Sequence, residues 1–325
     1  MLTRSQIDGI AEDAGWRTQW SSSLEKVMRL QNVPVLLMSG TIPKEFEGEL
    51  WEKLGLSPDG STPLYVRVLR ESTQRLNISY QVANLEFKSE RPGKDATDEE
   101  KTQWFEEWVT KIQEHVEELS ALLNDDERGI IFFSEREFTQ QVADRLGLPV
   151  ITGDSKQADR DQIWAKWHAG NSPIICTNKA GYYGVDFPHV GFTLHVDRPR
   201  SMLDFAQSSG RAGRGGQIAL SLVLLPFITR KPSKREAGME ETFGGTRAIK
   251  DLLRSEACYR VKMAQFLDGA PQSCANLAER HGVEAVAWCG NCTPTEEIEN
   301  WEARWDYPYA LGGMWFEYGV VTMNS

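Results

Sequence analysis

The sequence lacks any run of about 18 consecutive apolar residues, so it contains no candidate for a membrane-spanning helix. Its first twenty residues, MLTRSQIDGIAEDAGWRTQW, also lack the apolar core of a secretory signal. Cysteine is scarce, with 5 residues in 325. In the intracellular protein that we therefore expect, these cysteines are reduced thiols or metal ligands rather than disulfides.

An excess of positive charge is missing as well, because the formal net charge is −11 at pH 7. This argues only weakly against nucleic-acid binding, since a local basic face matters more than the total. Basic residues gather between Arg198 and Arg235, whereas acidic residues gather at 95–107 and 125–127. The alternative for the basic run at 229–235 is an ordinary solvated loop.

Short apolar runs alternate with helical patterns along most of the chain. The expected strands are 64–69, 78–83, 129–133, 149–152, 173–177, 191–196 and 218–225, with another buried run in 33–43. The expected helices are 44–54, 104–123, 135–146, 155–168, 201–208 and 246–266. Strands separated by helices predict an α/β fold whose parallel sheet is covered on both faces.

Residues 204–216, which read DFAQSSGRAGRGG, place Arg211 and Arg214 three residues apart among small residues. Guanidinium groups are rigid forked donors that suit the oxygens of a phosphate. The stretch precedes the apolar run 218–225, as a nucleotide-binding segment beside a central strand would. A solvated, flexible loop is the alternative.

Four of the cysteines lie close together in the last part of the sequence. Cys258, Cys274, Cys289 and Cys292 could supply four thiolates to a tetrahedral structural zinc, and the last two have knuckle spacing. The alternative is that Cys289 and Cys292 are reduced surface thiols. Cys176 lies inside an apolar run and is expected to be a small core residue.

The order of five segments carries a family resemblance. GIIFFSE, ITGDSKQADR, IICTNKAGYYGVDFPHV, HVDRP and FAQSSGRAGRGG together resemble the second RecA-like domain of the RecQ-type DNA helicases of superfamily 2. LLMSGTIP looks like the motif that closes the first RecA-like domain of that family. The resemblance covers roughly 33–292, and the divergent fungal and telomere-linked RecQ-like helicases are the most similar subgroup.

The resemblance implies a RecA-like parallel sheet with helices on both faces and a small helical zinc-binding module. The predicted divisions are 1–62, a C-terminal remnant of the first RecA-like domain, and 63–228, the second. They continue with 244–293, the zinc-binding module, and 294–325, an unassigned tail.

The resemblance also implies roles for single residues. The arginine-finger motif that faces ATP on the opposite domain is matched by Gln207, Arg211 and Arg214. Coupling to the nucleotide state is assigned to Gly184, Asp186, Ser39 and Thr41. DNA contact is assigned to Ser134, Arg160 and Thr177.

RecQ-type helicases carry a zinc module that opens with a cysteine followed by basic residues on a helix, which Cys258-Tyr259-Arg260 resembles. The interval between Cys274 and Cys289 is longer than the usual one. Cys274 is therefore the least secure ligand, and His281 is its alternative.

Several family features are absent. The sequence has no GxxxxGK[ST] segment to hold the phosphates of ATP and no acidic magnesium motif, since 125–128 (DDER) follows no strand. Ser208 and Gly215 replace acidic residues of the finger motif, and GYYG at 181–184 replaces FGMG. We therefore expect that this chain alone does not hydrolyse ATP at a useful rate.

The predicted function is the C-terminal motor domain and zinc module of a RecQ-like ATP-dependent 3′-to-5′ DNA helicase in the nucleus. Its partners would be single-stranded or partly duplex DNA, with ATP and Mg²⁺ only beside a complete first RecA-like domain. The alternative is a non-catalytic nucleic-acid-binding or adaptor protein derived from a helicase. A further possibility is that another polypeptide supplies the missing domain.

Overall fold

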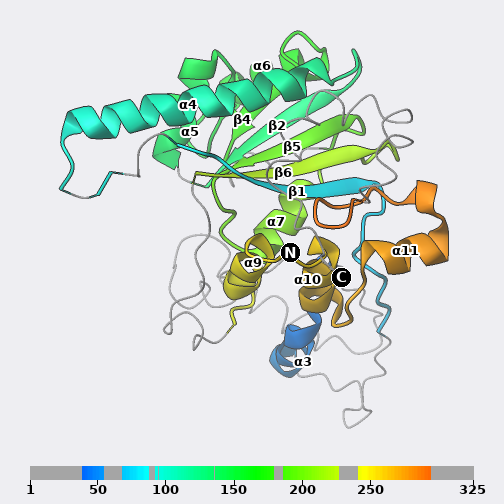
Figure 1. Ribbon diagram of the computed structural model, residues 1–325. Helices are drawn as coiled ribbons and strands as arrows, with labels where there is room; N and C mark the ends of the chain where they lie inside the picture. The colour runs from blue at the N-terminus through cyan, green and yellow to red at the C-terminus, as the bar shows by residue number, and fades with distance from the viewer. Residues whose placement is uncertain are drawn as a thin grey trace.

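A computed structural model describes residues 39–54, 68–87, 92–93, 95–134, 136–178, 186–226 and 241–293 (Figure 1). Its centre is a six-stranded parallel sheet in the order β1-β6-β5-β2-β4-β3. The strands are β1 (Ile78–Asn84), β2 (Arg128–Phe133), β3 (Val150–Ile151), β4 (Ile174–Thr177), β5 (Val190–Val196) and β6 (Ala219–Leu225). The predicted α/β class and parallel sheet are confirmed.

Alternating side chains divide the interior into two cores. In β2, Ile130 and Phe132 pack into one core while Ile131 and Phe133 pack into the other. This alternation is what a strand buried on both faces must show, because successive side chains point to opposite sides. Both faces of the sheet are therefore apolar and need helices to cover them.

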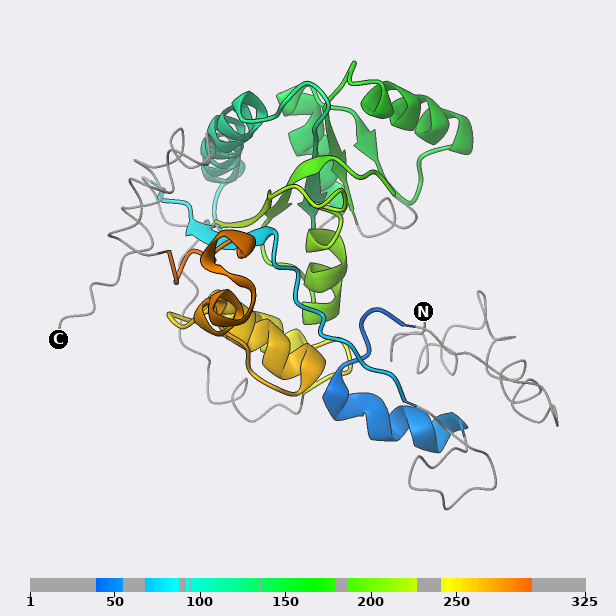
Figure 2. The same ribbon diagram turned by 90° about the vertical axis from the view of Figure 1, so that its right-hand side faces the viewer.

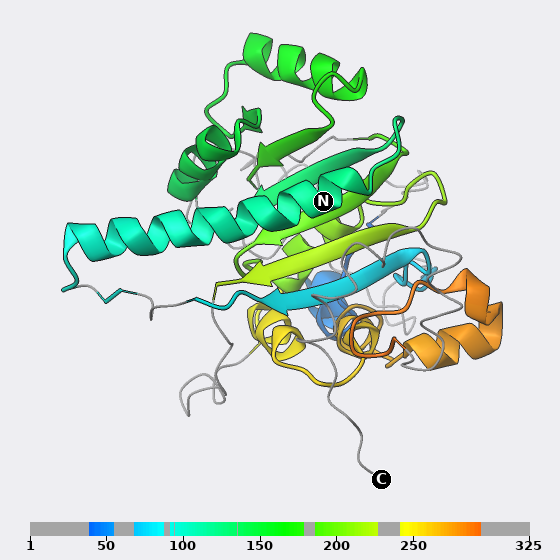
Figure 3. The ribbon, with the colours of Figure 1, turned by 45° about the horizontal axis from the view of Figure 1, so that its top comes forward.

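Different sets of helices cover the two faces of the sheet. One face carries α4 (Asp98–Ala121) and α5 (Arg136–Leu146), and the other carries α6 (Gln157–His168) and α7 (Met202–Ser209). The cysteine module lies on the α7 side and comprises α9 (Thr246–Leu253), α10 (Tyr259–Asp268), α11 (Cys274–His281) and η2 (Val283–Ala285). Figure 3 shows α4 crossing one face, with the module beyond β1. No helix among the described residues is long and apolar enough to cross a membrane.

Helix α4 begins earlier than the sequence periodicity predicts. Thr97 caps it, because the Thr97 hydroxyl accepts from the Glu100 amide and the Glu100 carboxylate accepts from the Thr97 amide. This reciprocal pair satisfies two backbone donors and starts the helix at Asp98. The prediction that this helix begins at residue 104 is therefore wrong by six residues.

The predicted single helix over 246–266 is also wrong, because the chain breaks between α9 and α10. The Asn291 side chain donates to the carbonyls of Ser255 and Ala257 at 2.7 and 3.0 Å. These bonds hold the connecting residues outside a helix and place Cys258 directly before α10. The break brings Cys258 to the other cysteines.

The end of the module runs along β1, the edge strand of the sheet. The Ala287 amide donates to the Leu76 carbonyl at 2.7 Å and the Gly290 amide to the Tyr80 carbonyl at 3.0 Å. The Ser79 hydroxyl donates to the Trp288 carbonyl at 2.7 Å. These bonds cover an edge that would otherwise be open to pairing with another chain.

The first described segment packs against the module. It contains η1 (Lys44–Phe46) and α3 (Glu47–Leu54), which lie beside α10 (Figure 2). Phe46 meets Phe243 at 5.4 Å between ring centroids, and Arg70 donates to the carbonyls of Ile42 and Leu267. The strand expected within 33–43 lies outside the described residues, as do 64–67, while residues 68 and 69 have no regular structure. The predicted domain boundaries stay predictions.

Candidate nucleotide and metal sites

The arginine loop, residues 210–216, joins α7 to β6 at the amino end of the sheet. The Gly213 amide donates to the Val190 carbonyl at 2.9 Å, and the Gly215 amide donates to the Pro188 carbonyl at 2.8 Å. Gly213 has φ +61°, a conformation that side-chain-bearing residues rarely adopt. The loop is therefore tied to the start of β5 by its own backbone.

Arg214 forms an ion pair with Asp186, with 2.5 Å between Nη1 and Oδ1. The side chain of Arg214 is 32% exposed and that of Asp186 is 84% exposed, so the pair lies at the surface. The sequence assigned these residues to two different motifs, and the structure brings them together. Arg211 follows α7 directly, and its amide donates to the Ser208 carbonyl.

Gln207 meets the first described segment. Its side-chain amide donates to the Thr41 hydroxyl at 3.1 Å, across 166 positions of sequence. The Thr41 amide in turn donates to the Ser39 hydroxyl at 3.4 Å. The predicted finger glutamine and the two predicted coupling residues therefore share one hydrogen-bonded group.

Ser208, which departs from the family pattern, lies against a buried histidine. The His195 Nε2 and the Ser208 Oγ are 2.7 Å apart, and the Ser208 hydroxyl donates to the Asp204 carbonyl at 2.6 Å. Burial lowers the pKa of His195 to about 3, although a backbone hydrogen bond at Leu222 opposes the shift. A neutral imidazole thus links β5 to α7, and no local sequence pattern signals this pairing.

The carboxyl ends of β2 and β5 form a second exposed edge. The Ser134 hydroxyl donates to the Arg198 carbonyl at 2.5 Å, and the Arg200 guanidinium donates to the Ser134 carbonyl at 2.7 and 3.1 Å. Ser134 thereby holds two residues of the basic stretch at this edge.

Two other residues predicted to contact DNA are engaged within the protein. The Thr177 side chain is fully buried, and its hydroxyl donates to the Ile151 carbonyl at 2.9 Å. The Arg160 guanidinium donates to the carbonyls of Ser155, Thr152 and Gly153. Their predicted DNA contacts stay predictions, and Gly184 lies outside the described residues.

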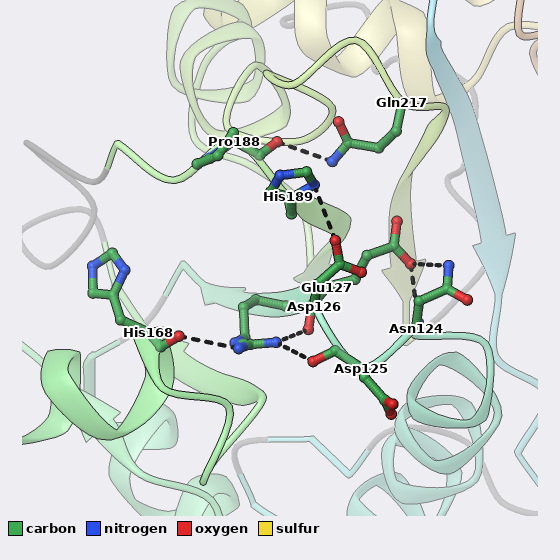
Figure 4. Close-up of polar contacts among 9 residues, drawn as sticks. Asn124, Asp125, Asp126, Glu127, His168, Pro188, His189 and Gln217 are labelled. Carbon is green, nitrogen blue, oxygen red and sulfur yellow. Dashed lines mark hydrogen bonds and ion pairs between the residues drawn. The ribbon is translucent and has the colours of Figure 1, made fainter.

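The acidic residues 125–127 lie directly before β2, which begins at Arg128, at the amino end of the sheet (Figure 4). The buried Arg128 guanidinium donates to the carbonyls of Asp125, Glu127, Trp167 and His168. The Asp126 carboxylate lies 3.5 Å from His189, and the Glu127 carboxylate accepts from Asn124. These contacts build a turn that leads into β2.

The four cysteines converge. Their sulfur atoms all lie within 4.8 Å of one another, with 3.7 Å between Cys258 and Cys274 and 3.8 Å between Cys258 and Cys289. Four sulfurs bound tetrahedrally to zinc at about 2.3 Å would stand about 3.8 Å apart. These distances are far too long for a disulfide and fit a single bound ion.

The cluster decides between the open alternatives for its ligands. Cys274 is fully buried within it, whereas His281 is exposed and outside it. Cys289 is also fully buried, so the interpretation as a surface thiol is wrong for this residue. Hydrogen bonds from Cys274, Cys289 and Cys292 lower the pKa of the Cys258 thiol. Burial instead raises the pKa of the isolated Cys176.

Part of the chain is similar to known proteins. Residues 111–216 match the helicase conserved C-terminal domain. The Caenorhabditis elegans protein named "Putative ATP-dependent DNA helicase Q1" is 25% identical over 268 residues, covering 78% of this chain and 37% of its own length. The RecQ-like DNA helicase BLM of Xenopus laevis is 25% identical over 210 residues, covering 62% and 13%.

The chain is similar to the C-terminal portion of RecQ-like superfamily 2 helicases. The predicted resemblance is thereby confirmed. The chain spans 37% of the length of the Caenorhabditis elegans relative and 13% of the length of the Xenopus laevis relative. An RNA helicase, DBP2 of Scheffersomyces stipitis, is 28% identical over 111 residues and covers only 33% of this chain and 21% of its own length. The RecQ-like relatives therefore match a longer share of the chain.

One solved structure with a similar arrangement is the Escherichia coli DEAD-box protein SrmB bound to RraA. It is 17% identical, with a TM-score of 0.35, and covers 47% of this chain and 79% of that one.

Proposed function

We propose that this chain supplies the C-terminal motor domain of a RecQ-like ATP-dependent DNA helicase. The strongest support comes from two contacts. They connect the predicted finger motif to the two predicted coupling motifs. Gln207 bonds Thr41, and Arg214 pairs with Asp186. Both contacts lie on or beside the segment that carries Arg211.

In this proposal the arginine loop faces ATP held by a first RecA-like domain. Arg211 and Arg214 would stabilise the charge that develops on the transferred phosphoryl group, as an arginine finger does. The exposed Asp186 partner would hold Arg214 in place until the domains close. Opening and closing of the two domains would then move the protein 3′ to 5′ along one strand.

Single-stranded DNA would follow the carboxyl edge of the sheet. Ser134 accepts two hydrogen bonds from the Arg200 guanidinium there and donates one to the Arg198 backbone carbonyl, which supports a phosphate-binding role for this edge. DNA is proposed rather than RNA because the DNA helicase relatives match the larger share of the chain. A DNA helicase of a eukaryotic cell would act in the nucleus, and a nuclear location is part of this proposal.

The cysteine cluster is proposed to hold a structural zinc ion. Four thiolates close the coordination sphere of zinc, so no position is left for a reacting water. Backbone amides of Cys274 and Cys289 donate to the sulfurs of Cys258 and Cys274, which helps to hold the thiolate form. When bound, the ion would supply cross-linking of the module rather than chemistry.

The arginine finger can be tested with a P-loop domain supplied in trans. The full chain is mixed with a separately expressed first motor domain of a RecQ-like helicase, and DNA-stimulated ATP hydrolysis is measured. Arg211→Ala should lower kcat by about 10³-fold, the magnitude typical of an arginine finger, while nucleotide binding by the first domain is retained. The chain alone should give no DNA-stimulated turnover.

Arg145→Ala is the matched control, because this arginine pairs with Glu106 on the α4–α5 surface and lies away from the arginine loop. It should leave the stimulated rate unchanged. Equal rates with wild-type chain and Arg211→Ala would contradict the finger. Binding of single-stranded DNA without any stimulation would favour the non-catalytic adaptor instead.

A further inference from the structure

Residues 75–77, which lead into the edge strand β1, form hydrogen bonds with the arginine loop. The Arg75 guanidinium donates to the carbonyls of Gly210, Ala212 and Gly213 at 3.3, 3.2 and 2.9 Å. The Asn77 amide donates to the carbonyls of Gly213 and Gln217 at 2.7 and 2.6 Å. Five hydrogen bonds from two side chains thus fix the backbone that carries Arg211 and Arg214.

The cysteine module also forms hydrogen bonds with this segment, through Arg260. Arg260 is fully buried, and its guanidinium donates to the carbonyls of Arg75, Leu76 and Ile78 at 2.8, 3.2 and 2.7 Å. A fourth bond, at 2.9 Å, reaches the Ala287 carbonyl. The guanidinium carbon also lies 5.1 Å from the centroid of the Tyr80 ring.

A buried guanidinium is costly unless its donors find partners. Four bonds from Nη1 and Nη2 to backbone carbonyls hold Arg260 in one position, although its Nε has no partner among the described residues. Arg260 stands two residues after Cys258, and its acceptor Ala287 stands two residues before Cys289. Both ends of the Arg260 contact are therefore anchored beside the cysteine cluster. Any loosening of the cluster would move Arg260 relative to residues 75–78.

We propose that Arg260 and Arg75 are positioning residues that couple the metal-binding cysteine cluster to the arginine loop. Metal binding fixes Arg260, Arg260 fixes residues 75–78, and Arg75 with Asn77 fixes the loop. The coupling rests on the proposed zinc site and gives it a role in setting the geometry of the arginine finger. Neither arginine touches the nucleotide or the metal.

Hydrogen exchange of the full zinc-loaded chain, followed by mass spectrometry, tests the relay without any ATP. Arg75→Lys should raise exchange in peptides covering 210–217 by about tenfold, because a lysine cannot keep the three bonds that the guanidinium makes to the loop carbonyls. Peptides covering 258–292 and the zinc content should stay at wild-type levels. Arg260→Lys should raise exchange both at 75–78 and at 210–217.

Arg160→Lys is the matched control, since Arg160 also donates to three carbonyls, in a different loop. It should raise exchange near 152–155 and leave 210–217 unchanged. Wild-type exchange at 128–133 reports that each variant keeps its fold. Should Arg75→Lys lose the fold, Asn77→Ala removes only two of the five bonds and should still raise exchange at 210–217.

Metal removal decides between coupling and general loosening. Chelation of wild-type protein should raise exchange at 75–78 and 210–217, whereas chelation of Arg75→Lys should add little at 210–217. Unchanged exchange at 210–217 on chelation, or in folded Arg75→Lys, overturns the proposal. Failure of the arginine finger would appear only as unchanged ATP hydrolysis, so the two failures are distinguishable.

Discussion

Arginine side chains bind two kinds of partner in this molecule. Arg75, Arg128, Arg160 and Arg260 donate mainly to backbone carbonyls and hold loops against the sheet. Arg200 and Arg214 lie at exposed edges, where a phosphate could approach them. The guanidinium fork serves both purposes because it offers five donors in one plane.

His195 makes the stability of the fold depend on pH. Its pKa is about 3 in the folded protein, because of burial, against about 6.5 in an unfolded chain. The unfolded state therefore binds an extra proton as the pH falls from 6.5 toward 3. Folding stability should fall by about 1.4 kcal/mol per pH unit in that window from this residue. Urea unfolding at pH 7 and pH 5 measures the loss.

His195→Gln keeps a group that can hydrogen-bond Ser208 but removes the titration, so its stability should fall less between pH 7 and pH 5. His115→Gln is the comparison, because burial also lowers the pKa of His115 and contributes in the same direction. A wild-type and a His195→Gln protein with the same pH dependence would show that His195 is accessible to protons in the fold.

At the scale of single elements, α4 depends on its first turn. Thr97→Ala removes the hydroxyl that accepts from the Glu100 amide, so the free energy of unfolding should fall by about 1 kcal/mol. Thr110→Ala is the control, since Thr110 is exposed in the middle of the same helix, where its hydroxyl bonds the Glu106 carbonyl. The free energy of unfolding of this variant should stay within about 0.5 kcal/mol of the wild-type value. Equal losses from both variants would contradict the cap.

The sequence allowed prediction of the elements whose signal is local. All the central strands were found within about two residues, because continuous apolar runs such as GIIFF have no other stable place than a doubly covered sheet. The start of α4 had a local signal, TDEE at 97–100, that apolar periodicity overlooked. The break before α10 had none, since it depends on Asn291, which lies far along the chain.

In the candidate site, too, local features could be predicted from the sequence and long-range contacts could not. The arginine loop and the four cysteines were recognisable from residue type and spacing. The contacts of Gln207 with Thr41 and of Arg75 with Gly210 join residues more than a hundred positions apart, so spacing could not reveal them. Arg160 was assigned to DNA binding by the family resemblance, and its bonds to the carbonyls of Ser155, Thr152 and Gly153 could not be read from the sequence.

At the scale of the whole molecule, a net charge of −11 must coexist with any binding of DNA. The carboxyl edge with Arg198 and Arg200 offers a local basic site. Arg200→Gln should weaken binding of single-stranded DNA and reduce the slope of log affinity against log salt by about 0.7, the value for one phosphate contact. Fluorescence anisotropy of a labelled oligonucleotide across a salt series measures both.

Arg145→Gln makes the same change in net charge on the α4–α5 surface, away from this edge. It should leave the slope at the wild-type value. Equal slopes for wild type and Arg200→Gln would place the DNA elsewhere.

The cysteine cluster should make the stability of the whole chain depend on zinc. The module covers the edge of the sheet and holds residues 75–78, so an ion that binds only the folded module stabilises more than the module itself. The free energy of unfolding should rise by about 1.4 kcal/mol for each tenfold increase in free zinc above the dissociation constant. Cys274→Ser should abolish this dependence, whereas Cys176→Ala, which lies in β4 away from the cluster, should lower stability but keep it. If the denaturant midpoint of the wild-type chain did not change with the concentration of free zinc, the four thiols would converge in this fold without holding a metal.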